Sequence, residues 1–227
     1  MSQFRAPDIS AYGDHAVLVK YDVDGFSAKV SDALQSLAVS LRAQDIWCEI
    51  VPAYDSLVVV FDGATITPKE AINRVEGQIA RNAKSEKPKA GKLVEIPVYY
   101  GGNDGPDMAT ICKSSGLSET EVIKLHSAKP YNVCMMGFVP GFTFLSAAPI
   151  ALHHPRQTTP RAKVAAGSVG IANWQTGIYG LESPGGWQII GRTPLSIFDK
   201  LRKDPFLVQA GDRIQFVPTT PHESGKS

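Results

Sequence analysis

The sequence predicts an α+β protein with two domains, a small split β-α-β sandwich followed by a mostly β domain that closes into a barrel. Three observations support this. The 227 residues suffice for two modest hydrophobic cores. The order of elements in the first third is β-α-β-β-α. Finally, 13 of the 20 glycines lie between Gly101 and Gly191, where they favour closely spaced turns and short strands.

The N-terminal domain begins with a strand over 15–21, followed by a helix over 27–41 whose apolar residues recur on one face. Two short apolar runs, 46–51 and 57–61, are joined by a turn-rich segment and are expected to pair. The second helix starts at 67–70, which has the form of a capping box with proline at the first helical position. With both helices on one sheet face, this is a ferredoxin-like split β-α-β sandwich.

The segment 81–92 is lysine-rich and is broken by Pro88 and Gly91, so it suits a linker better than a core. We therefore place the domains at 1–88 and 89–227.

The second domain contains one expected helical pair within a mainly β pattern. The first helix runs from Asp104 to Lys113, and the second follows a capping box at 118–121 and ends at His126. Strands are expected over three further segments, 164–172, 188–190 and 213–218. A closed or nearly closed barrel is the most economical topology.

Composition argues against several classes of function. Lys and Arg number 23 against 22 Asp and Glu, so no broad field attracts nucleic acid or an anionic membrane. No stretch approaches the length of a membrane span or a leader, so a cytoplasmic location is expected. Three widely spaced cysteines and the adjacent pair His153-His154 do not predict a metal site. The phosphate-binding patterns GxxxxGK[ST] and GxGxxG do not occur.

Glycine and proline motifs crowd the segment 131–193, and this density is typical of a binding site. Its motifs are GFVPGF at 137–142, PR at 155–156, PR at 160–161, AGSV at 166–169, QTGIY at 175–179 and SPGGW at 183–187.

Three arginines in this region could bind a carboxylate or a phosphate. Arg156 and Arg161 each follow a proline, so stiff backbone presents two guanidinium groups, and Arg192 follows a predicted strand. The alternative is that these are ordinary solvated arginines.

The loop at 137–142 and the AGSV turn offer a second set of candidates. Phe138 and Phe142 could wall a pocket, or could belong to a rigid turn with its aromatic rings in the core. Ser168 does not fit a nucleophile elbow because Ala166 stands where glycine is required. A turn that offers backbone N–H groups to an anion is the better interpretation.

Gln175 and Tyr179 supply an amide and a phenol along one strand, with Gly177 between them on the same face. Such a mixture of donors and acceptors suits an amide or lactam substrate, or else satisfies neighbouring strands. His126, at a helix end, could act as an acid or base or could stabilise the helix dipole.

Taken in order, these motifs resemble the KipI-like family, also described as allophanate hydrolase subunit 1 and, in bacteria, as the B subunit of 5-oxoprolinase. Upstream, Gly13-Asp14 and the segment 95–98 fit as well. Two positions depart from the family pattern: Ala165 stands where proline is usual, and Phe144 where tyrosine is common.

The resemblance implies a cyclophilin-like β-barrel after the α+β domain, and a subunit of an ATP-dependent 5-oxoprolinase that opens 5-oxo-L-proline to L-glutamate. The implied partners are a KipA-like, carboxyltransferase-type subunit and a LamB/YcsF-like subunit, and the chain is expected to be inactive alone. The complex would use ATP, with the subunit that holds it left open.

Roles for individual residues also follow from the resemblance. Arg156, Arg161 or Arg192 would hold the substrate carboxylate or a phosphorylated intermediate, Gln175 and Tyr179 would orient the lactam, and His126 would transfer protons. Alternatives are a KipI-like inhibitor of a histidine kinase and a subunit of an allophanate or urea-processing amide hydrolase.

Overall fold

The structure, a computed structural model, describes residues 6–83 and 91–220 and divides into two compact units, Met1–Ala90 and Gly91–Ser227. The predicted boundary between residues 88 and 89 lies outside the described residues. The predicted mixed α+β class is confirmed. Among the helices described, none is long and apolar enough to cross a membrane.

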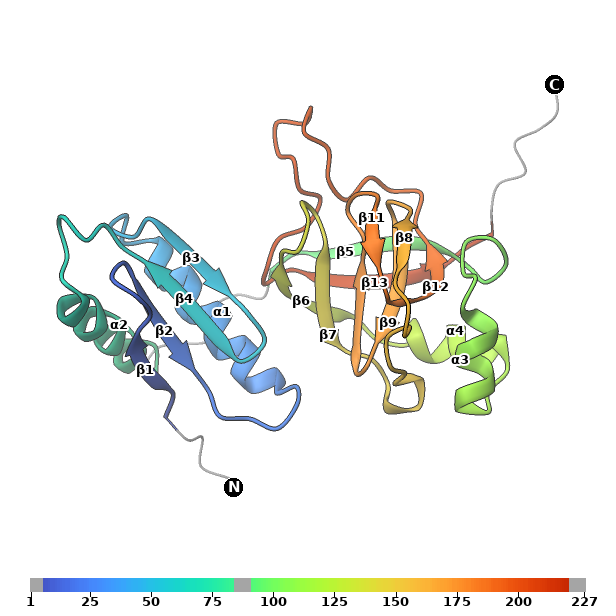
Figure 1. Cartoon of the computed structure of the whole chain (residues 1–227), viewed down its shortest axis with the longest axis horizontal. Helices are drawn as coiled ribbons and strands as arrows, with labels where there is room; N and C mark the ends of the chain where they lie inside the picture. Colours follow the sequence, from blue (N-terminus) through green and yellow to red (C-terminus); the bar gives the residue numbers. More distant parts are fainter. Residues whose placement is uncertain (1–5, 84–90, 221–227) are drawn as a thin grey trace. The chain divides into compact units, whose positions relative to one another are not determined.

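The first unit contains a four-stranded antiparallel sheet with the strand order β1-β2-β4-β3 (Figure 1). Its strands are β1 (Asp8–Ala11), β2 (Ala16–Lys20), β3 (Glu49–Pro52) and β4 (Ser56–Val60). Strand β1 is additional to the predicted order. It is short and partly exposed, and only one of its four residues is β-branched, so the sequence carries a weak strand signal there.

Helices α1 (Ala28–Arg42) and α2 (Pro68–Asn82) cover one face of this sheet (Figure 1). Val17 of β2 and Val59 of β4 lie in the same buried cluster as apolar residues of both helices. The predicted capping box starts α2, since Thr67 and Glu70 satisfy each other's backbone N–H groups. The split β-α-β sandwich is therefore present, with β1 as an extra edge strand.

The second unit is built on a closed barrel of seven strands in the order β10-β7-β6-β13-β5-β12-β9. Its strands are β5 (Leu93–Tyr100), β6 (Tyr131–Met136), β7 (Thr143–Ala147), β9 (Ser168–Ala172), β10 (Gln175–Ile178), β12 (Gln188–Arg192) and β13 (Arg213–Pro218). Strands β5 and β13, the first and last of the unit, pair in parallel and close the barrel.

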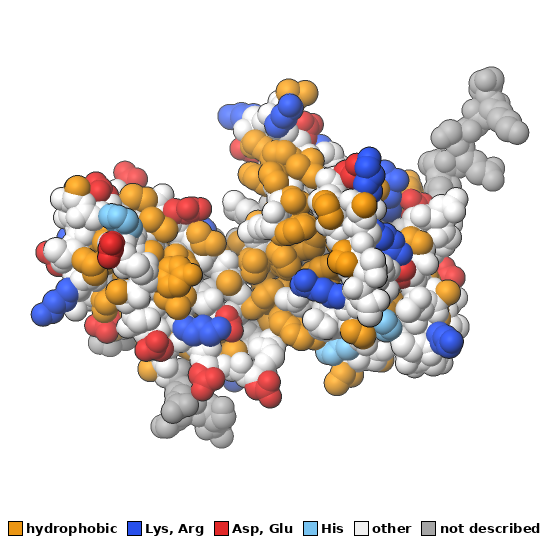
Figure 2. Space-filling model, in the orientation of Figure 1, with side chains coloured by type: hydrophobic (Ala, Val, Ile, Leu, Met, Phe, Trp, Pro, Cys, Tyr) orange, Lys and Arg blue, Asp and Glu red, His pale blue; other side chains and the backbone are white. Residues whose placement is uncertain are grey.

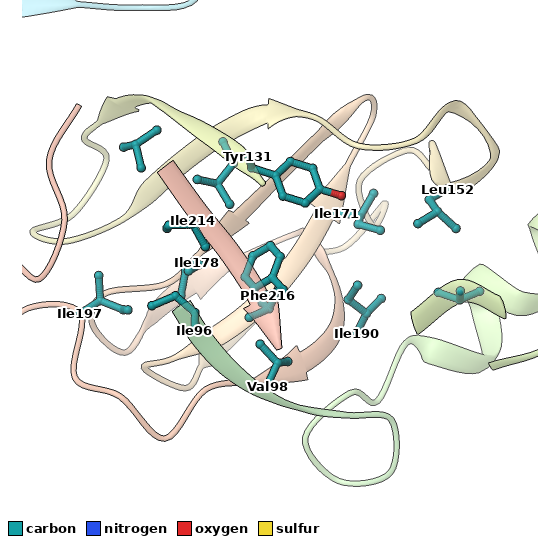
Figure 3. Close-up of a cluster of buried hydrophobic side chains, with 14 of the residues drawn as sticks. Ile96, Val98, Tyr131, Leu152, Ile171, Ile178, Ile190, Ile197, Ile214 and Phe216 are labelled. Atoms are coloured by element: carbon teal, nitrogen blue, oxygen red, sulfur yellow. The ribbon is translucent and has the colours of Figure 1, made fainter. Parts of the chain in front are cut away.

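The barrel interior is a continuous apolar core. Figure 3 shows Ile96, Ile171, Ile190 and Phe216 among the side chains that converge from different strands. Ile171 and Ile178 alternate with residues that face outward, as the two-residue period of a strand requires.

Two helices and a short 3-10 turn accompany the barrel: α3 (Met108–Ser115), α4 (Glu119–His126) and η1 (Ile150–Leu152). The predicted Ser118–Glu121 capping box begins α4. Helix α3 starts later than the predicted Asp104, because the preceding residues form a tight turn in which Gly105 N–H donates to Gly101 O.

Two features outside the barrel frame the region of interest. A small hairpin pairs β8 (Arg161–Val164) with β11 (Ser183–Gly185), so the strand predicted over 164–172 is interrupted by a turn. Between β12 and β13, residues 195–208 form a projection that we call the finger (Figure 1).

Candidate functional site

Trp187 packs against two paired glycines on the outside of the barrel wall. Gly170 of β9 is directly opposite Gly177 of β10. A Cβ added at Gly177 would lie 3.2 Å from the Trp187 ring and 2.8 Å from the Thr143 carbonyl oxygen. Glycine at both positions therefore lets the Trp187 side chain pack on bare backbone, with its Cβ over Gly170 and its ring over Gly177. This aromatic cluster extends to Phe142 and Phe144, whose ring centroids lie 5.3 and 5.9 Å from that of Trp187.

Tyr179 is enclosed in the same cluster, because its ring packs edge-on against Phe142 at 4.8 Å. Burial raises the pKa of the phenol, against the opposing effects of a hydrogen bond from the Trp187 backbone and the charges of Arg156 and Arg161. Gly185 abuts the phenol oxygen so closely that no Cβ fits there. A substrate could reach this hydroxyl only if the β8/β11 hairpin moved.

Arg161 does bind an anion, but the anion is the protein's own Asp107. Both guanidinium nitrogens donate to the Asp107 carboxylate, at 2.9 and 2.7 Å. The buried carboxylate also accepts from Gln157 Nε2 at 3.0 Å and from the Ile189 N–H at 2.6 Å. The predicted clamp is therefore a structural ion pair that ties the start of α3 to β8, and the expectation that Arg161 holds substrate needs correction.

Arg156 remains available. It is exposed, and its Cζ lies 5.9 Å from the centroid of the Trp187 ring, a distance at which a cation-π contact is favourable. No carboxylate of the described residues lies within ion-pair distance of it.

His126 lies inside the barrel, away from any solvent-accessible site. Its side chain stacks on Phe216 at 4.7 Å and is fully buried. The Thr176 hydroxyl donates to Gly170 O at 3.0 Å, so the His126 Nε2–H donates to Thr176 Oγ1 at 2.8 Å and Nδ1 accepts from the Tyr100 hydroxyl at 2.7 Å.

This buried network holds the imidazole neutral, because burial lowers the pKa of His126 to about 3. A ring with both nitrogens occupied and no path to solvent does not fit the predicted role in proton transfer. Its role in the described structure is to satisfy polar groups within the core.

Arg192 lines a pocket of about 600 Å³. Its Nε donates to Ala166 O at 3.2 Å, and its Nη1 lies 4.0 Å from the Asp104 carboxylate. Nη2 has no partner among the described residues. Tyr99 is its cross-strand neighbour and also lines the pocket. Of the three predicted arginines, Arg192 is thus the one that combines a free donor with a cavity.

The remaining walls of this pocket come from two turns and the base of the finger. They include Gly167, Gly180, Leu181, Thr193, Pro194, Leu195, Ser196, Ile197 and Phe198. Gly167 has φ +83°, and a Cβ there would collide with Thr193 O, so this turn requires glycine.

Ser168 and its turn do not present backbone donors to the pocket. Gly167 N–H donates to Tyr179 O at 2.7 Å, and Ser168 N–H donates to Ala165 O at 3.2 Å. The expectation that this turn offers free N–H groups to an anion is therefore wrong. The Ser168 side chain is itself buried.

The 137–142 loop separates its two phenylalanines. Phe142 is buried in the aromatic cluster, whereas Phe138 has φ +67°, a conformation rare for a residue with a side chain, and is 66% exposed. Neither lines the pocket. Gly141 makes a close backbone approach to Gly180 and Phe198 and so fixes this loop beside the finger.

Gln175 begins strand β10, and Tyr179 follows its last residue. At about 3.3 Å per residue, their Cα atoms lie roughly 13 Å apart. Gly177 and Tyr179 do share one face, as predicted, and that face is the outer one, but neither Gln175 nor Tyr179 lines the pocket.

Two groups of residues thus emerge from the predicted set. Arg156, Phe142 and Tyr179 gather around Trp187, while Arg192 occupies the pocket. The sequence reasoning missed Asp107, Tyr99 and Phe198, which depend on long-range packing. Across the described residues, no three His, Cys, Asp or Glu side chains gather to hold a metal ion.

The fold, an α+β sandwich joined to a closed barrel, is that of a carboxyltransferase-type protein. The solved structure of TTHA0988 matches it with a TM-score of 0.79 and 33% identity, over 91% of this chain and 40% of the TTHA0988 chain. This chain thus spans about two fifths of that longer one. It belongs to the family described as carboxyltransferase domain, subdomain C and D, which matches residues 7–208.

Curated proteins that resemble this chain have more specific names than the family. A protein of Escherichia coli O157:H7, named as the B subunit of 5-oxoprolinase, is 43% identical over 75% of this chain and 77% of the relative. A protein of the same name from Bacillus subtilis is 37% identical over 92% of this chain and 91% of the relative. Urea amidolyase of Saccharomyces cerevisiae is more distant, at 25% identity over 94% of this chain and only 13% of that protein.

Proposed function

We propose that the chain is one subunit of an ATP-dependent 5-oxoprolinase, which opens 5-oxo-L-proline to L-glutamate together with a carboxyltransferase-type subunit and a LamB/YcsF-like subunit. The observation that carries this proposal is the similarity to two proteins named as the B subunit of 5-oxoprolinase, which extends over at least three quarters of each chain.

The Arg192 pocket supports a role in substrate binding. A 5-oxoproline molecule carries one carboxylate and one small lactam ring, and a cavity of about 600 Å³ accommodates it. The free Nη2 of Arg192 can donate to the carboxylate, while Ala166 O and Asp104 hold the guanidinium in place. The phenylalanine and glycine walls suit the apolar edge of the ring.

The pocket lacks a complete set of catalytic groups, which supports a subunit that is inactive alone. Asp104 is the one carboxylate among the described lining residues, and it faces Arg192. His126 is enclosed in the core and Tyr179 under its hairpin. Proton transfer to the leaving nitrogen would then depend on groups from another subunit.

The described residues do not fit an ATP phosphate chain. The glycine turn at Gly167-Ser168 has its backbone N–H groups bonded within the protein, and one arginine alone lines the pocket. We therefore assign ATP to the complex and derive no step through it on this chain.

Reconstitution tests the proposal. The chain alone, each pair of subunits and the complete mixture are incubated with ATP and 5-oxoproline, and glutamate release is measured. We expect turnover only from the complete mixture, and none without ATP. A complete mixture that leaves 5-oxoproline intact would contradict the proposal. Allophanate and urea-derived amides are assayed in parallel, because the urea amidolyase relative aligns with nearly the whole chain.

Two arginine variants locate the substrate carboxylate within the active complex. Arg192→Ala is expected to raise KM for 5-oxoproline at least tenfold, because the free donor in the pocket is lost. Arg156→Ala is the matched comparison, since it removes an exposed guanidinium over Trp187 instead. If KM rises in the Arg156 variant alone, the substrate carboxylate binds beside Trp187 and not in the Arg192 pocket.

A further inference from the structure

The finger is a projection braced by contacts across its own two arms. Phe198 and Phe206 form a bridge across it with ring centroids 5.1 Å apart, and the Asp199 N–H donates to Pro205 O at 2.8 Å. At its base, Ile197 and Val208 are buried in the barrel core.

Side-chain hydrogen bonds also fix the finger tip. Asp199 Oδ1 accepts from the Leu201 N–H at 3.0 Å, and Arg202 Nη1 donates to Ser196 O at 3.0 Å. These bonds favour one shape of the tip, which lowers the entropy lost on binding.

This ordered projection exposes large apolar side chains. Leu201 at the tip is 87% exposed, Phe206 is 45% exposed and Leu195 at the base is 37% exposed. Phe138 belongs to the neighbouring loop, which packs on the finger where Gly141 meets Phe198. We call Leu195, Leu201, Phe206 and Phe138 the docking patch. Figure 2 shows hydrophobic side chains gathered over the finger and continuing below it onto the barrel.

The docking patch borders the Arg192 pocket. Leu195 belongs to the patch and also lines the pocket, and Phe198, which contacts Phe206, lines it as well. A protein bound to the patch would thus lie at the pocket mouth.

We infer that the docking patch binds the carboxyltransferase-type subunit of the complex, and that this partner closes the Arg192 pocket. The inference rests on the proposed function. Two observations favour the carboxyltransferase-type subunit as the occupant. The matching family is described as subdomains C and D of a carboxyltransferase domain, so a partner of the same type would supply the remaining subdomains, and in TTHA0988 this fold is continuous with a longer chain.

The chemistry of the patch also fits a protein interface better than a membrane. Its apolar side chains run from tip to base along the finger, with charged residues around them, as in an interface with a few buried anchors and a polar rim. The cations at the tip, Lys200, Arg202 and Lys203, are flanked by Asp199 and Asp204, which weakens attraction to anionic lipid.

The test compares Leu201→Glu with Ile150→Glu. Both side chains are almost fully exposed, at 87% and 84%, but Ile150 lies on η1, outside the patch. The dissociation constant for the purified carboxyltransferase-type subunit is measured by titration calorimetry. We expect at least tenfold weaker binding for Leu201→Glu and less than a twofold change for Ile150→Glu, with unchanged melting temperatures for both.

The outcomes separate this inference from the proposed function. Equal affinity of both variants would overturn the docking patch, even if the complete mixture opens 5-oxoproline. Weaker binding by Leu201→Glu alone, in a mixture without turnover, would support the patch and contradict the activity. Flotation of the chain with anionic phosphatidylserine vesicles, lost in Leu201→Glu, together with unaltered affinity for the carboxyltransferase-type partner, would assign the finger to a membrane and overturn the inference.

Discussion

Arg161 and Asp107 form a two-pronged ion pair between residues 54 positions apart in the sequence. The pair joins the start of α3 to the β8 strand, and the carboxylate is buried among two further donors. The arginine of the PR motif at 160–161 therefore stabilises the fold.

Loss of this pair should destabilise the barrel unit. Arg161→Ala leaves the buried Asp107 charge without its counterion, so we expect a loss of roughly 2 kcal/mol or more in unfolding free energy. Lys163→Ala on the same strand is the control, because Lys163 and Glu182 form an exposed pair that contributes less than about 1 kcal/mol. Urea titration measures both, and equal effects would contradict the structural role of Arg161.

His126 should make stability depend on pH. The folded pKa of about 3 is below the ordinary value of 6.5, so the unfolded chain binds more protons between these values. Stability should therefore fall as the pH drops through this window, by about 1.4 kcal/mol per pH unit from this residue at most. His126→Gln should flatten the dependence in urea titrations at pH 4.5 to 7. If the variant's stability changes with pH as steeply as that of the unmodified protein, other groups cause the pH dependence.

The glycine pair beneath Trp187 should resist substitution. In Gly177→Ala the new methyl meets backbone at Thr143 as well as the indole, so we expect a loss of about 1–3 kcal/mol and a shift in tryptophan emission. Gly137→Ala is the control, because a Cβ there lies 3.8 Å from the flexible Met135 side chain. If Gly177→Ala proved as stable as the control, the packing of Trp187 would differ from that described.

Replacing one glycine by alanine should increase the stability of the protein. Gly77 lies inside α2, and a Cβ there would have a single neighbour, Arg81, at 3.7 Å. Gly77→Ala should stabilise the first unit by roughly 0.5–1 kcal/mol through better helix propensity. Ala80→Gly in the same helix should instead lower the unfolding free energy. Calorimetric unfolding measures both, and a destabilising Gly77→Ala would reveal a packing constraint on α2 that these contacts do not contain.

The elements that could be predicted are those with local signals. The capping boxes at Thr67 and Ser118 start α2 and α4 as expected, because each is complete within four residues. Strand β1 could not be predicted, since its place depends on pairing with β2 and its four residues are too few to establish a period. The turn at Gly167 likewise divides a run that reads as one strand.

The candidate site was less predictable because its geometry arises from distant segments. The motifs identified arginines suited to anions, but which of them stays free depends on Asp107 and Asp104, both remote in sequence. The burial of His126 follows from barrel closure around Thr176 and Phe216. Residue type thus indicated the chemistry, whereas long-range packing decided which groups are available.

The parallel pairing of β5 with β13 sets an order of events during synthesis. Strand β5 emerges from the ribosome more than 100 residues before its partner, so the barrel cannot close until the last strand is made. The first unit, complete by Asn82, can fold well before then. In the interval β5 has an unpaired edge that is open to other chains. Premature termination before Arg213 should therefore yield a folded first unit attached to an aggregation-prone open sheet.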